Sequence, residues 1–291
     1  MNEISEVKAI EDLDKLINEF IRRGKVFVEY SCYLPGLKDH REGHRTIRHV
    51  YDHEYLAFTK SLKTLISIKK LLEIGNNEDT YILLRSIFEN YLAARYLNVN
   101  VYDESDLPKL DEYIANRINI TLGYYSINRR NIMNEEGEQV GKLRSIKSQL
   151  VGLDSLYYDE LYGFLSRFSH LDFSNLDYYI NRRASFVIEK ESDSILCRLV
   201  IVFVMTKIFE CIVTIEGEDF YDEQEKIRCY SIVMESLITQ RRIFDEYIDE
   251  LNNEVNSDGE NRHRVKLRRM LKNMNISLED SIGDIEKDSL F

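Results

Sequence analysis

The sequence predicts an all-α protein, a single up-down helical bundle of about seven helices with a C-terminal helical appendage. Three observations support this fold class. Hydrophobic residues make up 44% of the 291 residues, which is enough for a substantial core. The chain has two prolines and 12 glycines, fewer turn-forming residues than an all-β chain of this length usually contains. Residues 81–97 are apolar on nearly every side of a helix, which is typical of a buried central helix.

The remaining elements follow from apolar residues at helical spacing and from the turn-forming residues between them. Gly75 is expected to end one helix, and Asn76-Asn77 to turn the chain into the central helix, so that these two helices are antiparallel neighbours. Residues 24–43 are predicted to form a loop with its turn at Pro35-Gly36. Besides 81–97, the predicted helices cover residues 4–25, 46–74, 107–133, 142–150, 154–170, 195–215 and 219–251.

The chain is expected to form one domain over residues 1–254, followed by a linker, a basic helix and an acidic tail over residues 255–291. Residues 195–215 have the length of a membrane span, but Arg198, Lys207 and Glu210 interrupt them. We therefore expect a second buried bundle helix there and no membrane association.

Composition narrows the function classes. The formal net charge of −12 argues against a broad surface that coats nucleic acid, although it allows a local basic cleft. The four cysteines show no C-x-x-C spacing and are expected to be reduced thiols of a cytoplasmic protein, and the acidic N-terminus is unlike a secretory or mitochondrial signal. No phosphate-binding loop, dinucleotide fingerprint or nucleophile elbow is present, so we expect no cofactor.

Arg85 and Glu89 lie four residues apart on the central helix, where charges on an apolar surface are costly unless they are paired or serve a site. Ser166 and His170 share one side of a later helix with Gly163, where a ligand or another helix could approach. Arginine binds phosphate through a planar fork, and histidine exchanges protons near neutral pH. The four residues are therefore a candidate phosphodiester site, and the alternative is a satisfied core network.

The segments Arg85-Ser86-Ile87-Phe88-Glu89 and Leu165-Ser166-Arg167-Phe168-Ser169-His170 also carry a resemblance. They resemble motifs of a family of uncharacterised bacterial helical proteins, whose genes are often found near mobile elements and phage-defence genes. The resemblance covers residues 50–215. It implies that the residues of these two motifs form a functional site, but it does not identify a reaction.

Residues 48–53 contain a second candidate. Arg48, His49 and His53 fit R-[NDH]-x-x-x-H and resemble the signature of HEPN ribonucleases, which are all-helical and commonly dimeric. Metal-independent RNA cleavage needs a base, an acid and a cation at the phosphate, and the resemblance implies these roles for Arg48 and His53. HEPN motifs usually lie late in a shorter domain, whereas this one opens the second helix.

The same region also contains His40, His44, His49 and His53 at spacings that could hold a metal. Because no downstream ligand is apparent, a solvated histidine-rich helix start is the favoured interpretation, and we expect no metal site. A basic stretch near the C-terminus could bind RNA or an acidic partner, but docking on the acidic body of the protein is favoured. Its charged residues are Arg262, Arg264, Lys266, Arg268, Arg269 and Lys272.

Two functions remain open. The first is a HEPN-like, metal-independent endoribonuclease or RNA-directed toxin that acts as a phage-defence effector, with His170 as proton carrier, Arg85 as phosphate holder and Glu89 orienting Arg85. For this function, Arg48 and His53 are either an alternative set of catalytic residues or a set contributed by a second subunit. The second is a non-catalytic helical module that binds a protein partner. A homodimer is expected in either case.

Overall fold

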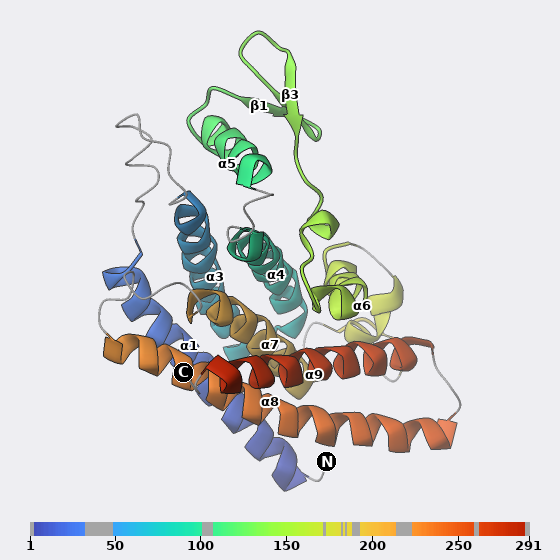
Figure 1. Cartoon of the computed structure of the whole chain (residues 1–291). Helices are drawn as coiled ribbons and strands as arrows, with labels where there is room; N and C mark the ends of the chain where they lie inside the picture. The colour runs from blue at the N-terminus through green and yellow to red at the C-terminus, as the bar shows by residue number, and fades with distance from the viewer. Residues whose placement is uncertain are drawn as a thin grey trace.

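The computed structural model describes residues 3–32, 49–100, 107–170, 173–181, 183, 185–187, 193–213, 223–258 and 262–288. Within them, eight α-helices form a bundle and three short strands form a small sheet at one end of it (Figure 1). The predicted all-α fold class is therefore confirmed. The helices are α1 (Glu3–Tyr30), α3 (His49–Glu73), α4 (Asn77–Asn100), α5 (Leu107–Thr121), α6 (Asp154–Phe168), α7 (Ser194–Val213), α8 (Glu223–Asp258) and α9 (Arg262–Asp288).

Helices α4 and α7 lie at the centre of the bundle, as predicted. Almost every residue of α7 is buried, because its side chains are apolar on all sides. Helix α4 packs against α3, α6 and α7, but it is not buried all round. Its Ile82 is 38% exposed, and Arg85 and Glu89 lie on a half-buried side. The prediction of a completely buried central helix is wrong for this side of α4.

The charges of α7 are all accommodated inside the protein. Arg198 pairs with Asp14 of α1 at 2.7 Å. Lys207 pairs with Glu210 at 3.1 Å and donates to the Ser281 hydroxyl of α9 at 2.6 Å. Because a buried ammonium is stable only when it is paired and hydrogen-bonded, these contacts explain how lysine can lie within a core helix. Among the described residues, no helix is long and apolar enough to cross a membrane.

Helix α1 continues beyond Gly24, where the sequence predicted a loop, and ends at Tyr30. The reason is tertiary. A Cβ atom at Gly24 would lie 2.7 Å from the Leu62 Cδ1 atom of α3, so glycine allows the two helices to approach closely. The predicted turn Pro35-Gly36 lies outside the described residues. Gly75 ends α3 as predicted, with a φ of 75°.

The predicted helix over residues 107–133 is wrong after Thr121. The chain instead forms an antiparallel sheet in the order β1-β2-β3, with one turn at Arg129-Arg130 and a second over residues 134–138. Arg129 and Gly137, with φ values of 59° and 79°, occupy these turns. The predicted helix over residues 142–150 is a 3-10 helix, Ile146–Gln149. The strands are β1 (Ser126–Asn128), β2 (Asn131–Met133) and β3 (Gln139–Lys142).

The C-terminal region differs from the prediction in its helix boundaries. Helix α8 continues through Asp258, over most of the predicted linker, and α9 contains both the basic stretch and acidic residues of the tail. Helix α9 packs against α6 and α8, as Figure 1 shows. The domain boundary at residue 254 remains a prediction, although α9 contributes to the main core through Met270, Leu271, Met274 and Leu278.

Candidate functional site

Arg85 and Glu89 form the ion pair that their spacing predicts. The Arg85 Nε atom donates to Glu89 Oε1 at 3.0 Å. The Arg85 Nη2 atom also donates to the hydroxyl oxygen of Tyr162 at 2.6 Å, and that hydroxyl donates to Glu89 Oε1 at 3.2 Å. The guanidinium carbon lies 4.7 Å from the centre of the Tyr162 ring. Sequence reasoning missed Tyr162, which connects this pair on α4 to helix α6.

The solvent exposure of this network determines how much it contributes to the stability of the fold. The side chains of Arg85 and Glu89 are 26% and 33% exposed, so neither charge is fully removed from water. An ion pair of this kind contributes roughly 1 kcal/mol or less to stability. The sequence-based expectation of charges buried in an apolar surface is therefore too strong for this pair. Two of the arginine nitrogens are already bound within the protein, which leaves one for a ligand.

The structure does not bring His170 to Arg85. Helices α4 and α6 are antiparallel, since Tyr81 packs on Phe168 with ring centroids 4.6 Å apart. At the other end of these two helices, the Tyr91 hydroxyl of α4 donates a hydrogen bond to Asp154, at the start of α6. His170 is exposed beyond the end of α6, eight residues after Tyr162 and about 12 Å further along the helix direction.

Ser166 lies one turn after Tyr162 and donates its hydroxyl to the Tyr162 carbonyl oxygen at 2.6 Å. This contact is internal to α6 and binds neither Arg85 nor Glu89. The predicted four-residue constellation is thus divided into an Arg85–Glu89–Tyr162 network, a serine bonded to its own helix, and a distant histidine. Its catalytic role remains a prediction.

His53 lies in the second turn of α3, and Arg48 lies outside the described residues. The His53 side chain is half-buried, and its Nδ1 atom is buried without a hydrogen-bond partner in the described structure. Burial of the imidazole, with a smaller contribution from the positive charge of Arg117, lowers the pKa of His53 to about 4. The ring is therefore neutral at physiological pH, with an unprotonated nitrogen that can act as a hydrogen-bond acceptor.

Arg117 of α5 is the residue near His53 that sequence reasoning missed. Its Nη2 atom donates to the Tyr113 hydroxyl at 3.3 Å, and its guanidinium carbon lies 5.4 Å from the Tyr113 ring centre. The Arg117 Nε atom is buried and has no hydrogen-bond partner within the described residues. The i, i+4 spacing of Tyr113 and Arg117 was the available sequence signal. The sequence contained no signal that Tyr113 and Arg117 lie beside α3.

A small core holds α5 at this end of the bundle. Val50 of α3 and Leu97 of α4 are buried with Leu110, Tyr113 and Ile114 of α5. Because Val50 is one turn before His53, packing of this core places α5 and its arginine beside the histidine. The proximity is therefore a product of tertiary packing between elements that are about 60 residues apart.

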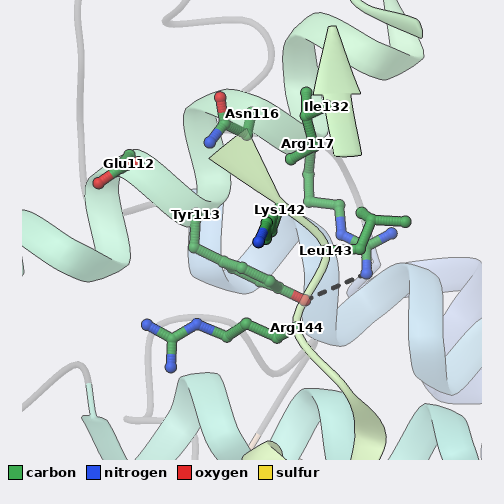
Figure 2. A pocket seen from close by; sticks show the side chains of 8 residues that line it. All are labelled: Glu112, Tyr113, Asn116, Arg117, Ile132, Lys142, Leu143 and Arg144. Atoms are coloured by element: carbon green, nitrogen blue, oxygen red, sulfur yellow. Dashed lines mark hydrogen bonds between the residues drawn. The ribbon is translucent and has the colours of Figure 1, made fainter. Parts of the chain in front are cut away.

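A pocket opens between α5, the sheet and the segment that follows β3, and we call it the α5–sheet pocket. Figure 2 shows the Tyr113 ring in the middle of the group, with Arg117 at its hydroxyl and the Arg144 side chain extending along it. The pocket contains three cations and one carboxylate. Its lining residues are Glu112, Tyr113, Asn116, Arg117, Ile132, Lys142, Leu143 and Arg144.

A separate polar cluster lies deep between α4 and α6. The Asp154 Oδ1 atom accepts hydrogen bonds from the Tyr91 hydroxyl at 2.7 Å and from the Tyr157 hydroxyl at 2.6 Å. Burial raises the pKa of both phenols well above the usual value, so they remain protonated donors. Asp154 therefore satisfies the hydroxyls of two buried tyrosines.

The basic stretch of α9 contacts the protein's own surface at two points. Arg269 pairs with Glu160 of α6 at 2.7 Å, and Arg268 donates to the Asn252 side chain at 3.2 Å. Lys266 and Lys272 are exposed, and Arg264 is half-buried. The side chain of Arg262 lies outside the described part of the chain. These contacts agree with docking on the acidic body, and binding of RNA or a partner by this stretch remains a prediction.

A metal site receives no support from the described residues, which contain no group of three or more histidine, cysteine, aspartate or glutamate side chains arranged to hold an ion. His40, His44 and the side chain of His49, which the sequence offered only as an alternative metal set, fall outside the part of the chain that the structure describes. The described cysteines are all free thiols.

Comparison with known proteins gives one match. The sequence model of a family of unknown function (DUF5677) matches residues 53–149, about a third of the chain. This agrees with the resemblance to an uncharacterised family, over a shorter range than residues 50–215. The match includes Arg85, Glu89, His53 and Arg117, but neither Ser166 nor His170. No curated protein and no solved structure matches the chain.

Proposed function

We propose that this protein is a metal-independent endoribonuclease whose site contains His53 of α3 and Arg117 of α5. The proposal is carried by one observation, the proximity of a neutral imidazole and a guanidinium that each keep a buried nitrogen without a hydrogen-bond partner in the described structure. Unsatisfied buried polar atoms are costly, and they cluster where a ligand completes their bonding. This assignment differs from the sequence-based choice of His170 and Arg85, which remains a prediction.

The chemistry assigns one role to each side chain. The neutral His53 ring accepts the proton of a ribose 2′-hydroxyl, whose oxygen attacks the adjacent phosphorus. Arg117 stabilises the charge of the pentavalent phosphate. The bond between phosphorus and the 5′-oxygen breaks, and that oxygen takes a proton from the Tyr113 hydroxyl. Tyr113 can serve because its oxygen accepts bonds from Arg117 and Gln149 at 3.3 and 3.4 Å while its own proton remains available.

Proton transfer from His53 back to Tyr113 restores both groups after the reaction. The products are a 2′,3′-cyclic phosphate and a 5′-hydroxyl, and no metal is required. The proposal includes a homodimer, which the resemblance to HEPN ribonucleases implies, and a cytoplasmic location, which cysteines without C-x-x-C spacing favour. It also includes a role as a toxin or phage-defence effector, which the resemblance to the uncharacterised bacterial family suggests.

The test is incubation of the purified protein with total RNA and with tRNA, in the presence and absence of EDTA. His53→Ala and Arg117→Ala are compared with His170→Ala, an exposed histidine that serves as a matched control. We expect discrete EDTA-resistant cleavage that is lost in the first two variants and kept in the third. Circular dichroism and thermal melting verify that each variant is folded. Loss of cleavage in His170→Ala alone would return the site to the end of α6.

A second candidate function is a non-catalytic helical module that binds a protein partner. The observation that favours it is the Arg85–Glu89–Tyr162 network, which uses the arginine to tie α4 to α6. This candidate predicts that Arg85→Ala lowers stability and that no form of the protein cleaves RNA. Complete absence of cleavage from RNA pools, together with a reduced melting temperature of Arg85→Ala, would favour it over the ribonuclease.

A further inference from the structure

We propose that the α5–sheet pocket binds a phosphate group of a single-stranded RNA, next to the phosphodiester on which His53 and Arg117 act. The inference rests on the proposed function, because the pocket shares Arg117 with the proposed reaction. The two can still fail separately. Binding in the pocket needs Lys142 and Arg144, whereas cleavage needs His53.

The charge of the pocket points to an anion. Arg117, Lys142 and Arg144 are accompanied by one carboxylate, Glu112, in a chain whose formal net charge is −12. Throughout the described residues, none of the three cations forms an ion pair with a carboxylate. Several other arginines of the described chain do, such as Arg198 with Asp14 and Arg269 with Glu160. A local concentration of uncompensated positive charge attracts an anionic ligand and raises its local concentration.

The two arginines are also held in place before any ligand binds. The guanidinium carbon of Arg144 lies 5.0 Å from the ring centre of Tyr96 and 5.9 Å from that of Tyr113. Arg117 also stacks on Tyr113, and its guanidinium carbon lies 5.4 Å from the centre of that ring. Stacking uses the faces of a guanidinium and leaves its N–H edges for planar, two-point bonding to phosphate oxygens. A site prepared in this way loses less side-chain entropy on binding.

The size of the pocket indicates what part of a ligand it holds. Its volume is about 180 Å³. Pockets that enclose a whole drug-sized molecule or cofactor have volumes of roughly 300–1,000 Å³. The α5–sheet pocket is therefore suited to one group of a longer ligand. Exposed Lys142 and Glu112 lie among its lining residues, so a strand can continue past it in solvent.

A single strand fits this arrangement better than a duplex. Arg144 lies against the rings of Tyr96 and Tyr113, which meet edge to face with centroids 6.2 Å apart. Unstacked bases and their phosphates bind to such combinations of cation and aromatic rings through stacking and charge together. The neighbouring His53 and Arg117 would then meet the next phosphodiester of the strand.

The test separates binding from cleavage by using a fluorescein-labelled oligoribonucleotide with 2′-O-methyl groups, which lacks the attacking hydroxyl. Fluorescence anisotropy is measured for the full chain and for Lys142→Gln, Arg144→Gln and the matched control Lys147→Gln, at a series of KCl concentrations. Lys147 is exposed, near the pocket in sequence, and pairs with Asp159 of α6 instead. Circular dichroism and melting curves verify the fold of each variant.

We expect each pocket variant to bind the strand about tenfold more weakly, since a charged hydrogen bond is lost. The slope of log affinity against log salt should fall by about 0.7 for each cation removed. Lys147→Gln should bind like the unchanged protein. Equal affinity of all forms, or no binding by the unchanged protein, would overturn the pocket assignment. So would a loss of affinity in Lys272→Gln alone, which would place the strand on α9.

Two further measurements identify the occupant and separate this inference from the proposed function. The strand should bind at least about tenfold more tightly than 5′-AMP, because several phosphates contribute to its binding. Equal affinities would overturn the assignment of a strand. Binding that depends on Lys142 and Arg144 without cleavage of unmodified RNA would uphold the pocket and refute the ribonuclease. Cleavage that is lost in His53→Ala and Arg117→Ala, together with unchanged binding by Lys142→Gln and Arg144→Gln, would uphold the ribonuclease and refute the pocket assignment.

Discussion

Arg85 of α4 donates a hydrogen bond of 2.6 Å to the hydroxyl of Tyr162 on α6, across 77 residues of sequence. Together with the bond from Arg85 to Glu89, this contact links two helices whose other contacts are mostly apolar or aromatic. The bond lies on a half-buried side of α4, and so its removal has a moderate cost.

Tyr162→Phe should lower the free energy of unfolding by about 1 kcal/mol, because one bond to a partly solvated charge is lost. Chemical denaturation measures the change. Tyr158→Phe is the matched control, since Tyr158 stacks on Tyr162 at 5.2 Å but its hydroxyl has no hydrogen bond within the described residues. An equal loss in both variants would contradict the role assigned to the Tyr162 hydroxyl.

Asp154→Ala should be far more disruptive. It leaves the buried hydroxyls of Tyr91 and Tyr157 without their acceptor, at a cost of about 3 kcal/mol in unfolding free energy. Asp154→Asn keeps an acceptor oxygen and should lose less. Asp159→Asn, on the same helix but 66% exposed, should change stability little. Comparable denaturation midpoints for Asp154→Ala and Asp159→Asn would show that the buried network contributes nothing.

Gly24→Ala and Gly163→Ala should change stability in opposite directions. A Cβ atom at Gly24 would lie 2.7 Å from Leu62, which is buried and cannot move freely, so a loss of about 1 kcal/mol is expected. No atom lies within 4 Å of a Cβ at Gly163, on an exposed side of α6. There the higher helix propensity of alanine should add about 0.5–1 kcal/mol. Thermal melting of the two variants checks the signs, and destabilisation by Gly163→Ala would indicate a contact that the fold does not show.

His53 should make the folded state less stable as pH falls. Its folded pKa of about 4 is below the ordinary value of 6.5, so the unfolded chain binds the proton first. The stabilising contribution of the neutral ring is complete above pH 6.5 and is lost as pH falls from 6.5 toward 4, with an upper limit of about 3 kcal/mol.

Because carboxylates also titrate at low pH, the measurement is the difference in unfolding free energy between the unchanged protein and His53→Gln over that range. This difference should change with pH as the His53 ring takes up its proton. A His53→Gln difference that is constant between pH 6.5 and 4 would show that the folded-state pKa is not depressed.

The sequence by itself determined the fold class, most helix positions and the Arg85–Glu89 pair. Helical spacing places residues four apart on one face whatever surrounds the helix, so this pair could be found without tertiary information. The apolar surface of 195–215 likewise required a buried helix. Helical spacing gave the wrong prediction at Gly24, where packing between helices allows α1 to continue, and after Thr121, where a small antiparallel sheet replaces the predicted helix.

Only the tertiary structure decided which charged groups share a site. It separated His170 from Arg85 through the antiparallel direction of α4 and α6, and it brought Arg117 beside His53 through the small core around Val50. It also added Tyr162 to the Arg85 network and placed Arg144 in the α5–sheet pocket. The physical reason is that contacts within a helix depend on spacing along the chain, whereas contacts between helices depend on how buried surfaces fit together.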